Sequence, residues 1–178
     1  MIPQVQRRPL NESTMAAPKM KSARSNLSAG ILAYRRRNGR LEVLLVHPGG
    51  PYWRNKDDGA WSIPKGEIDL DEDAEKAARR EFGEELGSAI SIGEIRKLGE
   101  VRQRGGKRVI AFAGEVDFDP ASLSSNTFEI EWPPRSGQHR TFPEVDRAEW
   151  FDFETARVKL LSGQIELLDS LKRLLEDS

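Results

Sequence analysis

Three glutamates lie three and four residues apart in one short segment, at Glu81, Glu84 and Glu85. If the segment is helical, this spacing places the three carboxylates on one stripe of the helix surface. Carboxylates on one stripe repel one another, so we expect a positive group to offset them. Converging carboxylate oxygens are also the ligands that Mg²⁺ prefers. The spacing alone leaves two interpretations open, a site for a hard divalent cation and an acidic surface patch.

The surrounding residues predict the helix. Asp71 is a suitable N-cap, Glu72 and Asp73 favour the first turn, and Gly87 is a suitable C-terminal stop. One to two turns before the glutamates, the same stripe carries small apolar residues, namely Ala74, Ala77 and Ala78. The glutamates therefore continue the inward face of the helix, which favours a site over a solvated patch.

The segment from residue 66 to 88 resembles the signature of a known family. The Nudix box reads G-x5-E-x7-R-E-U-x-E-E-x-G-U, where U is a bulky apolar residue, and all seven fixed letters are present at the right spacing. The matching residues are Gly66, Glu72, Arg80, Glu81, Phe82, Glu84, Glu85 and Gly87. Ser88 departs from the pattern because it stands where the last apolar residue belongs, a position of packing rather than of a ligand.

The resemblance implies a fold and a metal site. We expect an α/β protein with the Nudix α/β/α sandwich and a mixed β-sheet over residues 27–178. Glu84 and Glu85 are implied as the main Mg²⁺ ligands, with Mn²⁺ as a possible substitute, and Glu81 as a further ligand or the base for water. The backbone carbonyl of Lys65 is implied as another ligand, and Glu67 can join through water. An ion pair between Arg80 and Glu72 is implied to brace the loop against the helix.

Members of the family often recruit one more acid from a late loop. Glu144 and Glu149 are the two candidates, and the position of Glu144 six residues before Trp150 resembles the late glutamate of members that cleave nucleoside triphosphates. We therefore place Glu144 ahead of Glu149 as a fourth ligand or the general base. An ordinary loop acid is the alternative.

Candidate substrate-binding residues lie outside the box. The loop before it contains Arg54 and Lys56, which can bind phosphate, near Tyr52, Trp53 and Trp61, which can stack a base. The side chain of Lys65 is free to reach a phosphate. Three residues of a Pro-rich segment can close over a substrate, namely Arg135, His139 and Arg140. We expect His47 to be a packed or surface residue, since two histidines support no histidine metal site.

The resemblance implies a hydrolase that cleaves a nucleoside diphosphate linked to another group, by attack of water at phosphorus. Sub-signatures for ADP-ribose, diadenosine polyphosphates and NADH are absent, and no cysteine serves the isoprenoid isomerase chemistry. The segments flanking the box resemble bacterial members described as NTP pyrophosphohydrolases, so an NTP-like substrate is favoured. The alternatives are hydrolysis of a dinucleoside or non-nucleotide polyphosphate, and a noncatalytic Nudix-fold module that binds a ligand or RNA.

Charge and composition limit the other functions. The 178 residues carry a net charge of −1, but residues 1–26 carry +4 and residues 66–87 carry −6. This balance argues against a nucleic-acid surface over the whole chain, and the resemblance implies a small-molecule nucleotide or polyphosphate as the partner. No run approaches the roughly 18 apolar residues of a membrane span, and no apolar signal segment begins the chain, so we expect a cytoplasmic protein. We interpret residues 1–26 as a flexible basic tail and 27–178 as one domain; the sequence does not address the oligomeric state.

Apolar patterning predicts the other elements of the domain. Strands are expected at residues 27–34, 41–47, 61–63, 95–103, 108–118 and 148–151, with a hairpin turn around Asn38 and Gly39. Residues 120–142 are expected to be irregular, apart from a short strand at 127–131. Two closing helices are expected at 152–161 and 164–176. The second carries an apolar stripe made of Ile165, Leu168, Leu171, Leu174 and Leu175.

Overall fold

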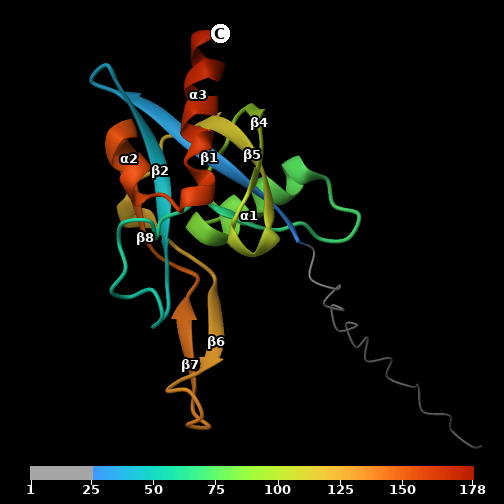
Figure 1. The fold of residues 1–178 in the computed structure, drawn as a ribbon, viewed down its shortest axis with the longest axis vertical. Helices are drawn as coiled ribbons and strands as arrows, with labels where there is room; N and C mark the ends of the chain where they lie inside the picture. Colours follow the sequence, from blue (N-terminus) through green and yellow to red (C-terminus); the bar gives the residue numbers. More distant parts are fainter. Residues whose placement is uncertain (1–25) are drawn as a thin grey trace, which may run out of the picture.

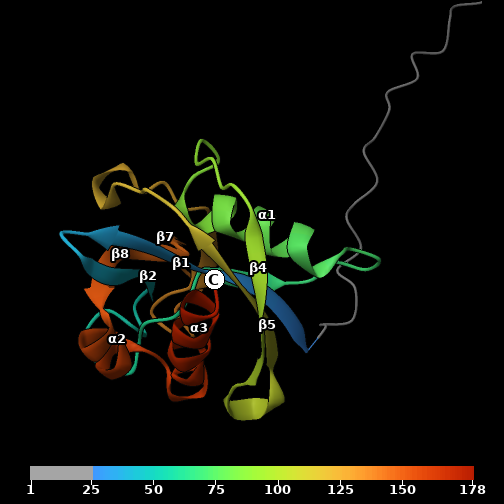
Figure 2. The ribbon, with the colours of Figure 1, turned by 90° about the horizontal axis from the view of Figure 1, so that it is seen from above.

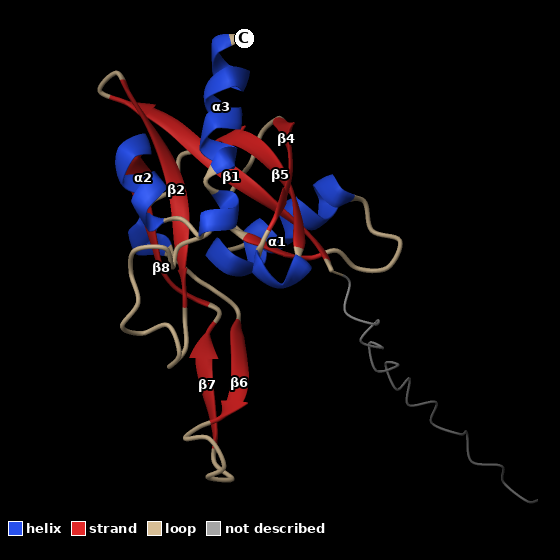
Figure 3. Cartoon of the chain, viewed as in Figure 1, coloured by secondary structure: helices blue, strands red, loops and turns tan. Residues whose placement is uncertain are grey.

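A computed structural model describes residues 26–178, so the predicted basic tail lies outside the described residues except for Asn26. Eight strands and three helices make up the described part of the chain (Figures 1 and 3). The strands are β1 (Leu27–Arg37), β2 (Arg40–Pro48), β3 (Lys65–Glu67), β4 (Ile95–Arg102), β5 (Arg108–Glu115), β6 (Thr127–Glu131), β7 (His139–Pro143) and β8 (Val145–Asp152). The helices are α1 (Ala74–Leu86), α2 (Phe153–Lys159) and α3 (Glu166–Glu176).

Strand β1 is the centre of a mixed sheet with the order β4-β5-β1-β2-β8. It pairs in parallel with β5 and antiparallel with β2, and its first residues also pair antiparallel with the short β3. The turn between β1 and β2 has positive φ at both Asn38 and Gly39, as the sequence predicts. This arrangement fixes β3, which begins the Nudix box, directly on the central strand.

Helices cover both faces of the sheet, as expected for the α/β/α sandwich (Figure 2). Alternation along β1 explains the two layers, because successive side chains point to opposite faces. Ala29, Ile31 and Ala33 belong to the core cluster under α1, whereas Leu32 belongs to the cluster under α2 and α3. Among the described α-helices, the box helix α1 therefore packs on the face opposite α2 and α3, where it contacts β1, β3, β5 and β8.

The segment 120–142 is more regular than the sequence predicted. The strand at 127–131 is confirmed, but it pairs antiparallel with β7, which the sequence analysis missed. The β6–β7 hairpin projects from the body of the domain (Figure 1). Strand β7 was missed because Phe142 is its one partly buried side chain, while His139, Arg140 and Thr141 are polar and exposed and Pro143 ends the strand.

Several other boundaries differ from the prediction: β1 and β8 are longer than expected, and α2 and α3 are shorter. The N-cap of α1 is Asp73, not Asp71, because its carboxylate accepts from the backbone N–H groups of Glu75 and Lys76. The expected strand at 61–63 makes only isolated bridges, to β2 and to Leu160. The expected strand 108–118 ends at Glu115. No helix within residues 26–178 is long and apolar enough to cross a membrane.

The apolar stripe of α3 gives a test of this packing. Leu167, which the predicted stripe omits, is 1% exposed, whereas Leu174 is only partly buried. We expect Leu167→Ala to lower the free energy of unfolding by about 2–5 kcal/mol, since it removes a fully buried side chain and leaves a cavity. Leu174→Ala should cost clearly less in the same urea titrations. The reverse order would contradict the packing of α3 described here.

Candidate active site

The helix α1 buries one face and carries acids at the end of that face. Its small residues Ala77 and Ala78 and the large Phe82 are fully buried against the sheet. Glu81 continues this face and is only 9% exposed. The close approach of the alanines to β1 therefore brings a carboxylate into the edge of the core, where it needs partners.

Arg80 is the main partner of these acids. Its Nε and Nη2 donate to the two carboxylate oxygens of Glu72, both at 2.9 Å. Its Nη1 donates to Oε1 of Glu81 at 2.7 Å and to Oε1 of Glu84 at 3.3 Å. The hydrogen bonds from Arg80 lower the pKa of Glu72 to about 2. One guanidinium thus supplies the positive charge expected from the spacing of the glutamates.

Gly66 makes room for the carboxylate of Glu81. A Cβ on Gly66 would lie 2.0 Å from both Cδ and Oε2 of Glu81, which no packing allows. Gly66 also pairs with Ala29 of the central strand, so its backbone has little freedom to withdraw. The glycine that opens the box is therefore required by close approach of the helix to β3.

Glu85 is held on the other side by Lys65. The backbone N–H of Lys65 donates to Oε2 of Glu85 at 3.1 Å, and the two side chains attract each other. Burial raises the pKa of Glu85 to about 8, against an ordinary value of 4.5, although Lys65 opposes the shift. Burial likewise lowers the pKa of Lys65. Glu85 is thus a carboxyl that needs a further positive charge to ionise readily at neutral pH.

Glu144, about sixty residues after the acids of α1 in the sequence, lies near them in the structure. Its backbone is fixed by a series of hydrogen bonds that starts on α1: the N–H of Asn126 donates to the carbonyl of Glu84 at 2.9 Å, and the N–H of Glu144 donates to the carbonyl of Asn126 at 2.8 Å. Ser125 adds a bond, because its hydroxyl accepts from the N–H of Val145 at 3.0 Å. Partial desolvation and the neighbouring Glu84 raise the pKa of Glu144.

The candidate Glu149 lies elsewhere. It borders a separate hollow with Arg35, Asp117 and Trp150. By contrast, Glu144 raises the pKa of both Glu81 and Glu85 through charge repulsion. The fold thus brings Glu144 to the acids of α1, and sequence reasoning missed Ser125 and Asn126, which hold it there.

The donor set suits a hard cation. Four carboxylates gather around one end of α1, namely Glu81, Glu84, Glu85 and Glu144, and they supply oxygen ligands only, as Mg²⁺ and Mn²⁺ prefer. Within residues 26–178, no three such side chains already surround a common point. Two of the carboxylates point toward Arg80 instead. The residues therefore fit a divalent cation in kind, with side-chain rotations needed to bring the oxygens together.

Comparison with known proteins decides the family. A model of the Nudix domain family matches residues 24–172, which is most of the chain. The chain belongs to the Nudix family. Membership supports a hydrolase that acts on pyrophosphate bonds, and Nudix hydrolases generally use a divalent cation such as Mg²⁺. No match is found among curated proteins.

Solved structures agree with this fold. An Ap4A hydrolase binary complex from C. elegans is 21% identical, with a TM-score of 0.59 over 85% of this chain and 99% of that one. The NUDIX domain of Shewanella oneidensis NrtR complexed with ADP ribose is 18% identical, with a TM-score of 0.58 over 90% and 94%. A MutT protein from Methanosarcina mazei is 21% identical, with a TM-score of 0.55 over 84% and 94%. At these identities the likeness establishes the fold alone.

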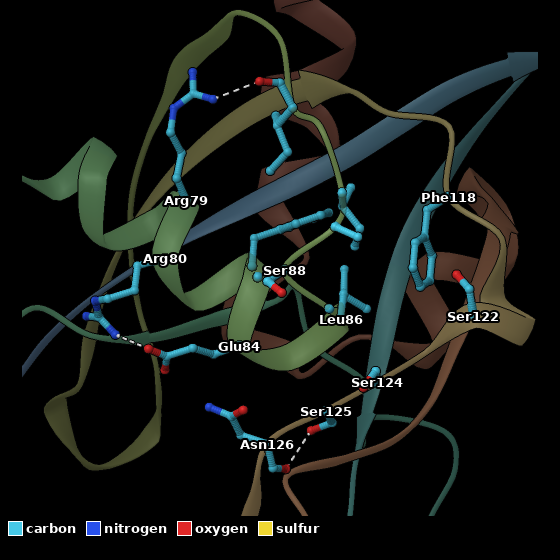
Figure 4. Close-up of a pocket in the computed structure, with 16 residues that line it drawn as sticks. Arg79, Arg80, Glu84, Leu86, Ser88, Phe118, Ser122, Ser124, Ser125 and Asn126 are labelled. Carbon is cyan, nitrogen blue, oxygen red and sulfur yellow. Dashed lines mark hydrogen bonds and ion pairs between the residues drawn. The ribbon is translucent and has the colours of Figure 1, made fainter.

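Two hollows adjoin the carboxylates of this Nudix domain. One of about 720 Å³ is lined by α1 and by residues 118–126, and Figure 4 shows Arg80 and Glu84 pointing toward each other at its edge, with Ser124, Ser125 and Asn126 on the neighbouring segment. The other, of about 360 Å³, contains Glu144 and aromatic side chains of the loop 48–53. The carboxylates thus border two spaces of different character, one with a mixed polar and apolar lining and one mainly apolar.

The candidate substrate-binding residues of the loop before the box fall into two groups in the structure, one near the smaller hollow and one in the core. Trp53 borders the smaller hollow, and Lys56 lies over its ring at 4.8 Å. Arg54 is exposed on the same loop. Trp61 was wrongly expected to stack a base: it is 1% exposed, and its indole N–H donates to Asp57 at 2.8 Å.

The structure also shows the surroundings of the two histidines and of Arg135 and Arg140. His47 is fully buried, as expected for a packed residue, and its ring nitrogens lie 2.7 Å from Oδ1 of Asp146 and 2.7 Å from the carbonyl of Lys56. It thereby ties the loop 49–56 to the start of β8. His139 lies beside Glu129 at 3.1 Å, while Arg140 lies opposite Ile130 in the hairpin. Arg135 has a positive φ between the two strands.

The contact between Gly66 and Glu81 can be tested directly. We expect Gly66→Ala to lower the free energy of unfolding by about 1–3 kcal/mol through overpacking, and to reduce hydrolysis at least tenfold by displacing the Glu81 carboxylate. Gly93→Ala is a matched control, because its Cβ would meet nothing within 4 Å. Equal behaviour of the two variants in denaturant titrations and activity assays would refute the contact.

The protonation of Glu85 predicts a pH-dependent response to cations. Because its folded pKa of about 8 exceeds the ordinary 4.5, the folded state keeps a proton that the unfolded chain releases, and this group lowers stability as pH rises from about 5 to 8. A divalent cation favours the ionised form. We therefore expect Mg²⁺ to raise the melting temperature more at pH 8 than at pH 6.

The control for this experiment is Glu94→Gln, which changes an exposed acid beyond the helix. It should leave the rise at pH 8 unchanged, whereas Glu85→Gln should diminish it. An identical rise at both pH values, or one that survives in Glu85→Gln, would speak against cation binding by Glu85.

Proposed function

We propose that this Nudix domain is a Mg²⁺-dependent pyrophosphohydrolase that cleaves a nucleoside diphosphate linked to another group, with NTP-like substrates favoured. One observation carries the proposal: the box carboxylates Glu81, Glu84 and Glu85 are supported by Arg80 and Lys65, and a fourth carboxylate, Glu144, joins them from the junction between β7 and β8. A purely structural acidic patch would not bury Glu81 or raise the pKa of Glu85 so far.

In this proposal Glu81, Glu84 and Glu85 hold the cations together with the carbonyl of Lys65. Bound Mg²⁺ would neutralise the diphosphate and lower the pKa of the attacking water. Arg80 and Glu72 act as a brace, because their bidentate pair joins the loop before α1 to the middle of the helix. Lys65, Arg54 and Lys56 are the cations available to substrate phosphates, and Trp53 contributes a ring to the neighbouring hollow.

Glu144 is the better candidate for the base that takes the proton from water. Its side chain is exposed and borders a hollow, whereas Glu81 is buried against Gly66 and bonded to Arg80. A raised pKa favours proton uptake by both Glu81 and Glu144, so exposure of Glu144 is what distinguishes the two. In this assignment Glu81 is a metal ligand and Glu144 accepts the proton from water. The alternative role of Glu144 is direct ligation of the metal.

The substrate can be found by a panel with Mg²⁺ or Mn²⁺. It should contain NTPs, dNTPs, oxidised nucleotides and nucleotide sugars, and it should include Ap4A and ADP-ribose because solved relatives bear those names. Cleavage of an NTP to a nucleoside monophosphate and pyrophosphate, or to a diphosphate and phosphate, identifies the anhydride bond that breaks, and the product that takes up ¹⁸O from labelled water identifies the phosphorus that water attacks. Exclusive cleavage of a dinucleoside or non-nucleotide polyphosphate would favour the second candidate function.

Variants of the acids test the assignment of roles. We expect Glu84→Gln and Glu85→Gln each to lower kcat by two orders of magnitude or more while the fold remains intact by circular dichroism. Glu144→Gln should lower kcat about 10²- to 10⁴-fold, the usual contribution of a general base, and far more than Glu149→Gln. The control Glu94→Gln should be unaffected.

Two outcomes would change these assignments. Near-normal turnover in both Glu84→Gln and Glu85→Gln would remove the metal site and would revive the alternative of a noncatalytic ligand- or RNA-binding module. A larger loss in Glu149→Gln than in Glu144→Gln would transfer the base role to Glu149.

A further inference from the structure

The smaller hollow next to the carboxylates has aromatic and apolar walls. It has a volume of about 360 Å³ and is bordered by Tyr52 and Trp53 of one loop, by Phe128 and Ile130 of β6, and by Glu144. Small-molecule pockets usually enclose about 300–1,000 Å³, so this one is near the lower limit. It has room for a single ring system.

The β6–β7 hairpin presents one apolar face to this hollow. Phe128 and Ile130 are two residues apart on β6 and therefore point to the same side. Phe142 and Arg140 stand opposite them on β7 and share that side. Glu129, between Phe128 and Ile130, points to the other side, where it meets His139.

The hairpin and the loop 48–53 touch on two sides of the hollow. Gly50 has φ +92°, and a Cβ there would lie 2.9 Å from the tip of the Phe128 ring. Tyr52 makes an edge-to-face contact with Trp132, with ring centroids 5.4 Å apart at 82°. The hollow is therefore a defined space between two segments that are far apart in the sequence.

The side chains that border the smaller hollow determine which kind of ligand it can bind. Apart from Glu144, the hydroxyl of Tyr52 and the indole N–H of Trp53, its side chains offer no polar group, so the base edges of a nucleotide would find few partners there. Aromatic walls do favour a planar ring, because every base has a face that can stack. Among the described residues Arg140 has no acidic partner, which leaves its charge on the apolar face for an anionic substrate.

We propose that this hollow binds the base of the nucleotide substrate, and that it recognises the base as a planar ring without reading its edges. The inference rests on the proposed function, because Glu144 links the hollow to the carboxylates that would act on the diphosphate. The site should then distinguish a nucleotide from a polyphosphate without a ring, but should discriminate weakly among bases. The β6–β7 hairpin is the element that provides this specificity.

The experiment compares ATP, GTP, CTP and UTP as substrates of the full chain, with inorganic triphosphate as a ringless competitive inhibitor. We expect kcat/KM for the four nucleotides to agree within about tenfold. Tyr52→Ala and Phe128→Ala should each raise KM about tenfold for all four, as loss of one base–aromatic stack predicts. They should change kcat less than twofold and leave the inhibition constant of triphosphate unchanged.

Two controls protect the result from effects on folding. Tyr52 is 62% exposed, so its replacement removes little packing. Glu129→Ala changes the same strand on its opposite face and should leave KM unaltered. Thermal melting of every variant accompanies the kinetics.

The possible failures are distinguishable. Cleavage of nucleotides by the wild type with unchanged KM in both variants would overturn the ring site and leave the proposed function standing. Discrimination among the four bases by more than about a hundredfold, or a fall in kcat at constant KM, would also overturn it. Failure of the wild type to cleave any nucleotide would remove the proposed function, and the inference with it.

Discussion

The repulsion among carboxylates at one end of α1 is the constraint on which the rest of the site depends. Glu81 and Glu85 lie partly inside the protein, where a negative charge is costly without a partner. Arg80 offsets the charge on one side and Lys65 on the other. Because both cations have fixed places, the acids remain close together at one end of the helix.

These fixed places come from the central strand. β1 pairs with β3, so Lys65 and Gly66 are held where α1 must pass, and the missing side chain of Gly66 lets Glu81 reach the sheet. On the other side of α1, the carbonyl groups near its end accept from the segment 124–126, which in turn bonds Glu144. Backbone hydrogen bonds thus hold Glu84 and Glu144, which are about sixty residues apart in the sequence, near each other. The side chains of the two glutamates take no part in these bonds.

The spacing of residues in the sequence predicted the helix α1 and its acids correctly. The predictions for Asp71 and Trp61 were wrong, because contacts with residues outside the local segment determine their surroundings. Asp71 looks like an N-cap, yet Glu72 is turned back toward Arg80, Asp71 takes a positive φ, and the helix starts only after Asp73. Trp61 looked like a surface ring for a base, yet it packs under Phe151 in the core. In both cases a contact with a distant residue outweighed the local preference.

By itself the sequence determined the Nudix box, the helix with its inward acids, the mixed α/β class and the pairing of Arg80 with Glu72, because these follow from spacings of a few residues and from a complete family signature. Only the tertiary structure decided that Glu144, rather than Glu149, lies near those acids, and that β6 and β7 form one wall of a hollow. Strand pairing and loop position depend on contacts between segments far apart along the chain. The spacing of residues within one short segment cannot predict such contacts.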